Sequence, residues 1–166
     1  MRRPDTKEQV CKLIEKIRII LPDAVLRTTF IVGLPGETEK EFEELLDFIK
    51  FVGFDCLGCF KYYPEAGTAA AQMPGQMPEK IKEERAKELM LTQQKIAFDI
   101  NKHRMGTQVS CLLDSVQKGI GTARFYGQAP EIDSVCIIKN CKAKPGTFLN
   151  TQIIGTKDYD LLLRQI

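Results

Sequence analysis

The stretch that most constrains the fold is residues 26–38, with the sequence LRTTFIVGLPGET. Its first half is rich in β-branched and aromatic residues, and the apolar run from Phe30 is typical of a strand covered on both faces, as in parallel sheets. The glycines and the proline that follow predict a turn. Thr38, with Glu41 three residues later, matches a capping box and predicts a helix directly after the turn. A strand, a glycine turn and a helix N-terminus in this order commonly place a ligand beyond the carboxyl end of the strand.

Composition sets limits on the kind of protein. The 166 residues are 43% hydrophobic and 28% charged, which fits one or two small soluble globular domains. A formal net charge of +2 and a single histidine give no reason to expect tight, non-specific binding of polyanions. No apolar run approaches the roughly 20 residues of a membrane helix, and the first residues do not resemble a signal sequence. We therefore expect a cytoplasmic protein with no membrane partner.

The chain has six cysteines, which without a secretory signal are expected to be reduced thiols. Only Cys56 and Cys59 have a spacing typical of metal ligands. On a strand, residues three apart point to opposite faces, and no second Cys-x-x-Cys or His pair completes a zinc site. The sequence therefore predicts a structural role for this pair and no metal ligands. No Ser/His/Asp, Cys/His or paired-carboxylate constellation can be assembled either, so no catalytic residue is assigned.

The first half of the chain alternates helices with strands. An amphipathic helix with a capping box at Thr6 ends at Pro22, the helix after the glycine turn ends near Gly53, and a strand over 56–62 follows. Short connections between such elements are typical of a right-handed parallel α/β array. Two parallel strands leave edges and apolar faces unpaired. The missing strands must therefore precede Met1 in a longer polypeptide or come from another chain, unless this region is marginally folded.

The second half begins with a loop and a long helix. Residues 63–78 contain too many prolines and glycines for a regular element and predict an ordered loop. A charged helix is expected over 78–104, with its charges mostly solvated. Its predicted inner face consists of Ile81, Leu89, Gln93, Ile96 and Ile100.

Beyond this helix, five short β-rich runs predict a small antiparallel barrel of the OB-like kind. These runs are residues 108–116, 122–126, 134–138, 148–155 and 161–166. The predicted architecture is thus an α/β region over 1–77, a connecting helix over 78–106 and an all-β domain over 107–166.

Side-chain alternation along the two predicted strands selects candidate binding residues. The residues that share one face of their strand are Arg27, Thr29, Ile31 and Gly33 on the first, and Phe60 and Tyr62 on the second. A buried Arg27 would hold an anionic group such as a carboxylate, whereas an exposed one would form an ordinary salt bridge. The two aromatic residues could stack on an aromatic ligand or belong to a core.

Several stretches carry a resemblance to a known family. They are MRRPDTKEQV at residues 1–10, the stretch 26–38 and FKYYPEAGT at residues 60–68. Together they resemble the last third of the catalytic barrel of the radical-SAM methylthiotransferases, followed by a sequence similar to a TRAM domain. APEID at residues 129–133, and Arg27 ahead of two threonines, resemble the RimO branch, which modifies an aspartate of a small-subunit ribosomal protein. The tRNA-modifying MiaB branch differs at both places.

This resemblance implies a fold and a reaction. The fold is the carboxyl-terminal part of a radical-SAM (βα) barrel followed by a five-stranded antiparallel TRAM barrel. The family uses S-adenosylmethionine (SAM) and two four-iron, four-sulfur clusters to form a 5′-deoxyadenosyl radical, abstract hydrogen from the substrate and insert a methylthio group. The residues implied to bind SAM are Thr29, Ile31 and Gly33, with Arg27, Phe60 and Tyr62 as further contacts.

The sequence also departs from the family pattern. The radical-SAM motif Cys-x-x-x-Cys-x-x-Cys is absent, as is the amino-terminal domain that carries the second cluster's cysteines, so the ligands of both clusters are missing. Tyr63 stands where relatives usually carry Ser, and Cys56 and Cys59 replace a typical Arg and Val. We therefore expect a carboxyl-terminal fragment that is inactive alone, requires the missing amino-terminal domains, and recognises a ribosomal protein, with a further RNA contact, through its TRAM domain. The alternatives are a stand-alone module that binds RNA or ribosomal protein, and a fragment of a tRNA-adenosine methylthiotransferase.

The incomplete sheet leads to a prediction about isolated fragments. Residues 107–166 should fold when expressed alone, whereas residues 1–105 should not, because two strands cannot bury their edges and faces. Thermal melts followed by circular dichroism check this. A cooperative melt of the 1–105 fragment would refute the partial-barrel interpretation.

Overall fold

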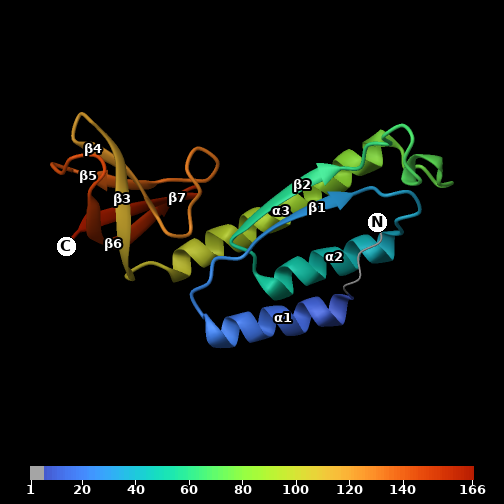
Figure 1. Ribbon diagram of the computed structural model, residues 1–166, viewed down its shortest axis with the longest axis horizontal. Coiled ribbons are helices and arrows are strands. Elements are labelled where there is room, and N and C mark those ends of the chain that lie inside the picture. Colours follow the sequence, from blue (N-terminus) through green and yellow to red (C-terminus); the bar gives the residue numbers. More distant parts are fainter. Residues whose placement is uncertain (1–5) are drawn as a thin grey trace. The chain divides into compact units, whose positions relative to one another are not determined.

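The computed structural model describes residues 6–166, which form helices and strands in two compact units (Figure 1). The first unit is Met1–Ala97 and the second is Phe98–Ile166. The boundary between them falls inside α3, a single helix over Glu79–His103. Each unit has its own core and is described by itself.

The first unit contains a parallel pair of strands with helices on one side. Its elements are α1 (Lys7–Ile20), β1 (Arg27–Val32), α2 (Glu39–Val52), β2 (Cys56–Lys61), the one-turn helix η1 (Ala70–Gln72) and most of α3. β1 and β2 pair in parallel from Arg27 opposite Cys56 to Val32 opposite Lys61. The predicted capping boxes at Thr6 and Thr38 are confirmed, as is the left-handed Gly53 that ends α2.

The core of this unit lies on one face of the two strands. Phe30, Phe48 and Phe54 form an aromatic cluster with ring centroids 6.0–6.3 Å apart. The buried residues around them are Ile14, Val32, Phe42, Leu46, Ile49, Val52 and Leu89. Burial alternates along β1, so among the described residues only one face of the strand is covered. The prediction of a strand covered on both faces is wrong for this part of the chain, because α1, α2 and α3 all contribute to the same core.

α3 buries the predicted face except at its start. Leu89 and Gln93 are buried and Ile96 and Ile100 are half-buried, as expected, but Ile81 is exposed. In its place Lys82 and Arg85 are buried, with only 5% and 6% of their surfaces exposed. The prediction that the charges of this helix are mostly solvated is therefore wrong for these two cations. The turn after β1 and the start of α2 supply acceptors for Arg85, and the Tyr62 carbonyl just after β2 supplies one for Lys82.

The second unit is a closed five-stranded barrel with the strand order β3-β4-β5-β7-β6. The strands are β3 (Gln108–Gln117), β4 (Ile120–Phe125), β5 (Cys136–Lys139), β6 (Phe148–Lys157) and β7 (Asp160–Gln165). Four of the pairings are antiparallel, but β5 pairs with β7 in parallel, so the prediction of an antiparallel barrel is wrong at this pair. The reason is one of parity: strand directions cannot alternate all the way round a closed ring with an odd number of strands.

Small and large side chains fill the barrel together. The buried residues include Cys111, Leu113, Ala123, Cys136, Ile138, Ile153, Leu161 and Leu163. Register shifts after Leu113 in β3 and after Ile153 in β6 mark bulges. Bulges bend strands and increase their twist, which helps so small a sheet to close.

The interior leaves no room for a side chain at Gly121. A Cβ atom built at Gly121 would lie 2.9 Å from Leu113 Cδ1 and 3.0 Å from Cys141 Cβ. Gly121→Ala should therefore lower the free energy of unfolding by about 1–3 kcal/mol, because overpacking forces side chains out of their preferred positions. Urea unfolding followed by circular dichroism measures this change.

Gly155→Ala is the matched control, since its Cβ would meet Leu162 Cδ1 at an ordinary 3.5 Å. It should change stability by no more than about 0.5 kcal/mol. Equal losses in the two variants would contradict the packing described for the barrel interior.

Candidate functional site

One face of the β1–β2 pair is open among the described residues. The register sets Thr29 opposite Gly58 and Ile31 opposite Phe60. Ile31 is 38% exposed and Phe60 is 65% exposed, and Arg27 and Thr29 are exposed as well. Four of the six predicted binding residues, Arg27, Thr29, Ile31 and Phe60, therefore lie together on an uncovered face that combines apolar side chains with a hydroxyl and a guanidinium.

A groove of about 580 Å³ runs beside β1. It is lined by residues of α1, β1 and α2 and by Phe54, with Val10, Ile14, Phe30 and Phe48 among its apolar walls. Within residues 6–166, β1 has β2 as its one strand neighbour, so no strand pairs with its other edge beside this groove. The open face and the open edge thus meet at the same strand.

The other two predicted residues, Gly33 and Tyr62, lie just beyond the ends of β1 and β2. Gly33 has φ of 79°, and a Cβ atom at this position would lie 2.5 Å from Lys82 Cγ. Lys82 Nζ donates a hydrogen bond to the Tyr62 carbonyl oxygen at 3.0 Å and lies 5.6 Å from the centre of the Tyr62 ring. Lys82 therefore packs against both strand ends, and this packing together with the left-handed backbone accounts for a glycine at Gly33.

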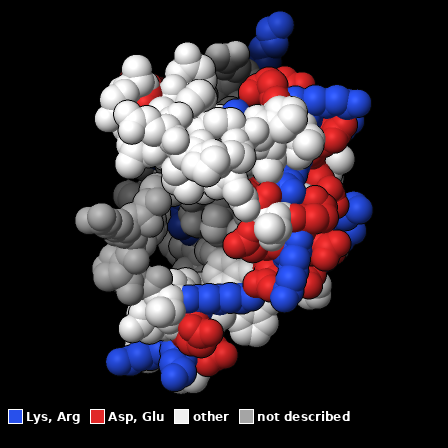
Figure 2. All heavy atoms as spheres, turned by 90° about the vertical axis from the view of Figure 1, so that its right-hand side faces the viewer, with Lys and Arg blue, Asp and Glu red and all other residues white. Residues whose placement is uncertain are grey.

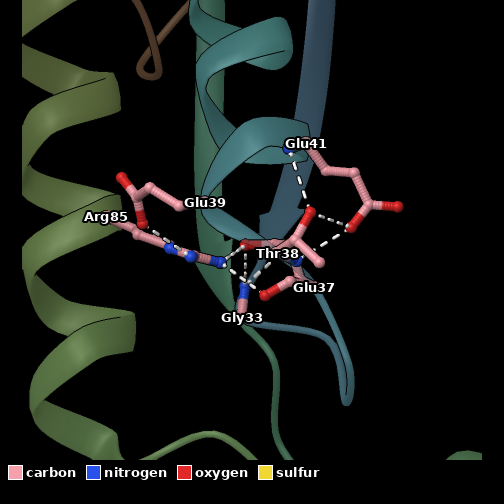
Figure 3. A network of polar contacts seen from close by, with 6 residues as sticks. All are labelled: Gly33, Glu37, Thr38, Glu39, Glu41 and Arg85. Carbon is pink, nitrogen blue, oxygen red and sulfur yellow. Dashed lines mark hydrogen bonds and ion pairs between the residues drawn. The ribbon is translucent and has the colours of Figure 1, made fainter.

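A carboxylate closes the turn after β1 (Figure 3). The Gly33 N–H donates to both carboxylate oxygens of Glu37, each at 3.1 Å. Arg85 donates from Nη1 to the Glu37 carboxylate and from Nη2 to Glu39 Oε2 at 2.9 Å. Thr38 caps α2 immediately beside this network. The turn is thus fixed by a buried ion pair whose cation comes from α3.

Other charges near the strand ends are paired in the same way. Lys61 forms hydrogen bonds with Glu79 and Glu83, which raise its pKa, and the bond with Lys61 lowers the pKa of Glu79. Burial raises the pKa of the Cys59 thiol, and the nearby Glu37 carboxylate raises it further. Figure 2 shows acidic and basic side chains interleaved on one side of the view. The cations near the strand ends are paired with carboxylates, and such mixed charges do not favour binding of a polyanion.

The loop between β2 and α3 is ordered, as predicted, and contains η1. Its Gly75 carbonyl accepts a hydrogen bond from the Gly36 N–H at 3.1 Å. Within the loop, Gln76 Nε2 donates to the carbonyls of Ala70 and Met73, at 3.0 and 3.1 Å. The loop is therefore held against the turn that follows β1.

Within residues 6–166, no group of three or more His, Cys, Asp and Glu side chains could hold a metal ion. Cys111, Cys136 and Cys141 are buried in the barrel, and Cys56 and Cys59 are half-buried. The thiols are therefore not gathered as an iron–sulfur cluster requires. None of the helices within the same residues has the length and apolar character that crossing a membrane requires.

The barrel offers a second candidate surface. Its exposed apolar side chains include Tyr126, Ile132, Phe148 and Ile154. A depression of about 490 Å³ is lined by residues of β3 and β6 and by Ile166. Arg124 on β4 pairs with Asp114 on β3 at 3.2 Å. A mixed surface of this kind suits contact with another macromolecule more than binding of a small ligand.

The residues that the sequence interpretation missed are Lys82 and Arg85. The sequence does contain a signal for them: residues 82, 85, 89 and 93 recur at helical spacing on the stripe that carries the buried Leu89 and Gln93. The position of Glu37 just ahead of α2 predicts either a complement to the helix dipole or a ligand contact. The structure places its carboxylate between Arg85 and the Gly33 N–H.

The packing at Gly33 gives a prediction. Gly33→Ala should destabilise the first unit by about 2 kcal/mol or more, because it combines a left-handed backbone with a clash against Lys82. Gly36→Ala is the control: it has φ of 82° but nothing within 4 Å of its Cβ position, so it should cost only about 1–2 kcal/mol. Urea unfolding compares the two. A loss in Gly33→Ala no larger than that in Gly36→Ala would show that contact with Lys82 is unimportant.

Comparisons with known proteins agree with this architecture. The TRAM domain model matches residues 105–166, which include the whole barrel. The chain is 44% identical over 165 residues to the ribosomal protein uS12 methylthiotransferase RimO of Pelotomaculum thermopropionicum, covering 97% of this chain and 37% of the relative. The proteins of the same name from Saccharophagus degradans and Vibrio cholerae are 40% and 41% identical, each aligned over 97% of this chain and 34% of its own length.

These matches confirm the resemblance that the sequence motifs indicated. The chain spans little more than a third of the length of the curated relatives it matches, and the matched part includes the TRAM domain. Over that part, the chain belongs to the RimO methylthiotransferase family.

Proposed function

We propose that this chain is the substrate-recognition part, and part of the SAM site, of a methylthiotransferase that modifies an aspartate of a small-subunit ribosomal protein in the cytoplasm. The observation that supports this most strongly is the 44% identity to a ribosomal protein uS12 methylthiotransferase over nearly the whole chain. Since the chain spans 37% of that relative, the catalytic activity belongs to a larger protein or assembly.

The open face of β1 and β2 fits SAM as a ligand. Ile31 and Phe60 expose apolar surface suited to the adenosyl group, and Thr29 and Arg27 add polar groups suited to the methionyl part. Bound SAM would supply the 5′-deoxyadenosyl radical of the reaction. The role of this chain is to bind and orient the cofactor and to shield one side of it from water.

The residues of this chain do not fit an iron–sulfur cluster. No three potential ligands converge within residues 6–166, and the thiols divide between the two units. We therefore assign both clusters to segments outside this chain, and expect the chain alone to be inactive.

We assign substrate recognition to the TRAM barrel, where exposed Tyr126 and Phe148 would contact the ribosomal protein or adjoining RNA. A stand-alone module that binds RNA or ribosomal protein is the alternative from another class. A fragment of a tRNA-adenosine methylthiotransferase is the alternative within the family. The RNA-binding alternative predicts an affinity that falls steeply with salt concentration.

A chimera tests the proposal directly. The aligned segment of the Pelotomaculum relative is replaced by this chain, and the reconstituted chimera is given SAM with either the ribosomal protein or tRNA. Mass spectrometry should detect a methylthio group on an aspartate of the ribosomal protein and none on tRNA. Modification of tRNA alone would favour the other branch of the family, and a chimera that binds SAM and both clusters but modifies neither substrate would contradict the proposal.

Variants locate the SAM site within that chimera. Ile31→Asp places a charge on the open face and should weaken SAM binding at least about tenfold in equilibrium dialysis, because it removes apolar contact with the adenosyl group and the charged carboxylate would lose water on binding. Lys139→Asp, at the end of β5, is the matched control and should leave SAM affinity unchanged. Equal effects of the two substitutions would place the SAM site elsewhere.

A further inference from the structure

The buried Arg85 lies outside the strands and the turn, yet it determines how the turn is held. It is 6% exposed, and its guanidinium lies 5.1 Å from the centre of the Phe42 ring. Nη1 donates to the Glu37 backbone carbonyl at 3.2 Å as well as to the Glu37 carboxylate. A buried cation with this many contacts has one position available to it, which suits it to orient a neighbouring group.

The group that Arg85 orients is the Glu37 carboxylate. Only 13% of the Glu37 side chain is exposed, and its two oxygens both accept from the Gly33 N–H. Without Arg85 this carboxylate would be a buried charge without its cation, and it would move toward water. The Gly33 N–H would then lose its acceptor, and the backbone at the end of β1 would be released.

We propose that Arg85 is a positioning residue for the ligand face: through Glu37 it fixes the backbone of the Gly33 turn, and so sets the edge of the face that carries Ile31. This assignment rests on the proposed function, because it takes that face to be the SAM site. It adds a residue of α3, which follows both strands in the chain, to the determinants of cofactor affinity.

A matched arginine makes the test specific. Arg18 of α1 donates from Nη1 to the Ala24 carbonyl at 2.6 Å and from Nη2 to the Gly53 carbonyl at 3.3 Å. These contacts lie ahead of the amino ends of β1 and β2, away from the Gly33 turn. Arg18 also pairs with the buried Asp55 carboxylate at 3.9 Å. Arg18→Met thus removes a cation that, like Arg85, contacts a buried carboxylate and backbone carbonyls of the same unit, and serves as the control for a purely stabilising role.

The first readout is hydrogen exchange of the Gly33 amide in the full 166-residue chain. Labelling with carbonyl-¹³C valine and ¹⁵N glycine selects Gly33 and Gly53, the two glycines that follow a valine, and Gly53→Asn removes the second signal. Exchange at Gly33 should be about tenfold faster or more in Arg85→Met and unchanged within about twofold in Arg18→Met. Unchanged exchange at Gly33 in Arg85→Met would overturn the proposal.

The second readout is the dissociation constant for SAM of the chimera described above. Arg85→Met should raise it about tenfold, Arg85→Lys should raise it less because a cation remains, and Arg18→Met should leave it within about twofold of the parent. Equal losses in Arg85→Met and Arg18→Met would reduce Arg85 to a stabilising residue and overturn the proposal. If the parent chimera does not bind SAM, the proposed function fails, while faster exchange at Gly33 in Arg85→Met would still support the control of the turn by Arg85.

Discussion

The first unit is built on only two parallel strands, and the described helices bury only one face of this small sheet. α1, α2 and α3 all contribute to the core on that face. Apolar side chains on the other face, such as Ile31 and Phe60, stay in contact with water, which costs roughly 25 cal/mol for each Å² of apolar surface left uncovered. A ligand or further protein that covers this face would remove that cost. The curated relatives are nearly three times as long as this chain and so contain further protein.

Near the carboxyl ends of the strands, two charged side chains of α3 are buried. Removing Arg85 and Lys82 from water is unfavourable unless each finds acceptors. Glu37 and Glu39 supply them for Arg85, and the Tyr62 carbonyl supplies one for Lys82. These contacts draw α3 against the strand ends so closely that no side chain fits at Gly33. Charge pairing and the glycine turn are therefore two parts of one arrangement.

Local signals in the sequence predicted local structure well. The capping boxes, the left-handed Gly53 and the two strands are set by residues close together in the chain, and the structure confirms them. The register also brings Ile31 and Phe60 opposite each other, as their common place on one face requires. What these residues bind remains a proposal, because alternation identifies a face and not its ligand.

The errors arose where the outcome depends on distant partners. The cations at positions 82 and 85 were expected in solvent because hydropathy does not register the acceptors that Tyr62 and Glu37, distant in the chain, provide just beyond the strands. The strand covered on both faces was expected because apolar runs do not report which neighbours are present. The parallel pairing of β5 with β7 follows from closing a ring of five strands, which no single stretch of sequence encodes.

The distribution of the thiols has a chemical consequence. Cys111, Cys136 and Cys141 are enclosed by the barrel, whereas Cys11, Cys56 and Cys59 of the first unit are half-buried. A thiol reacts only when reagent reaches it and it can ionise. Oxidants should therefore modify the half-buried Cys11 and Cys56 before the enclosed barrel thiols, with Cys59 slower because its pKa is raised. Oxidative damage would therefore accumulate on the side of the chain that carries the open face, and modification of the barrel thiols would record that the barrel itself had opened.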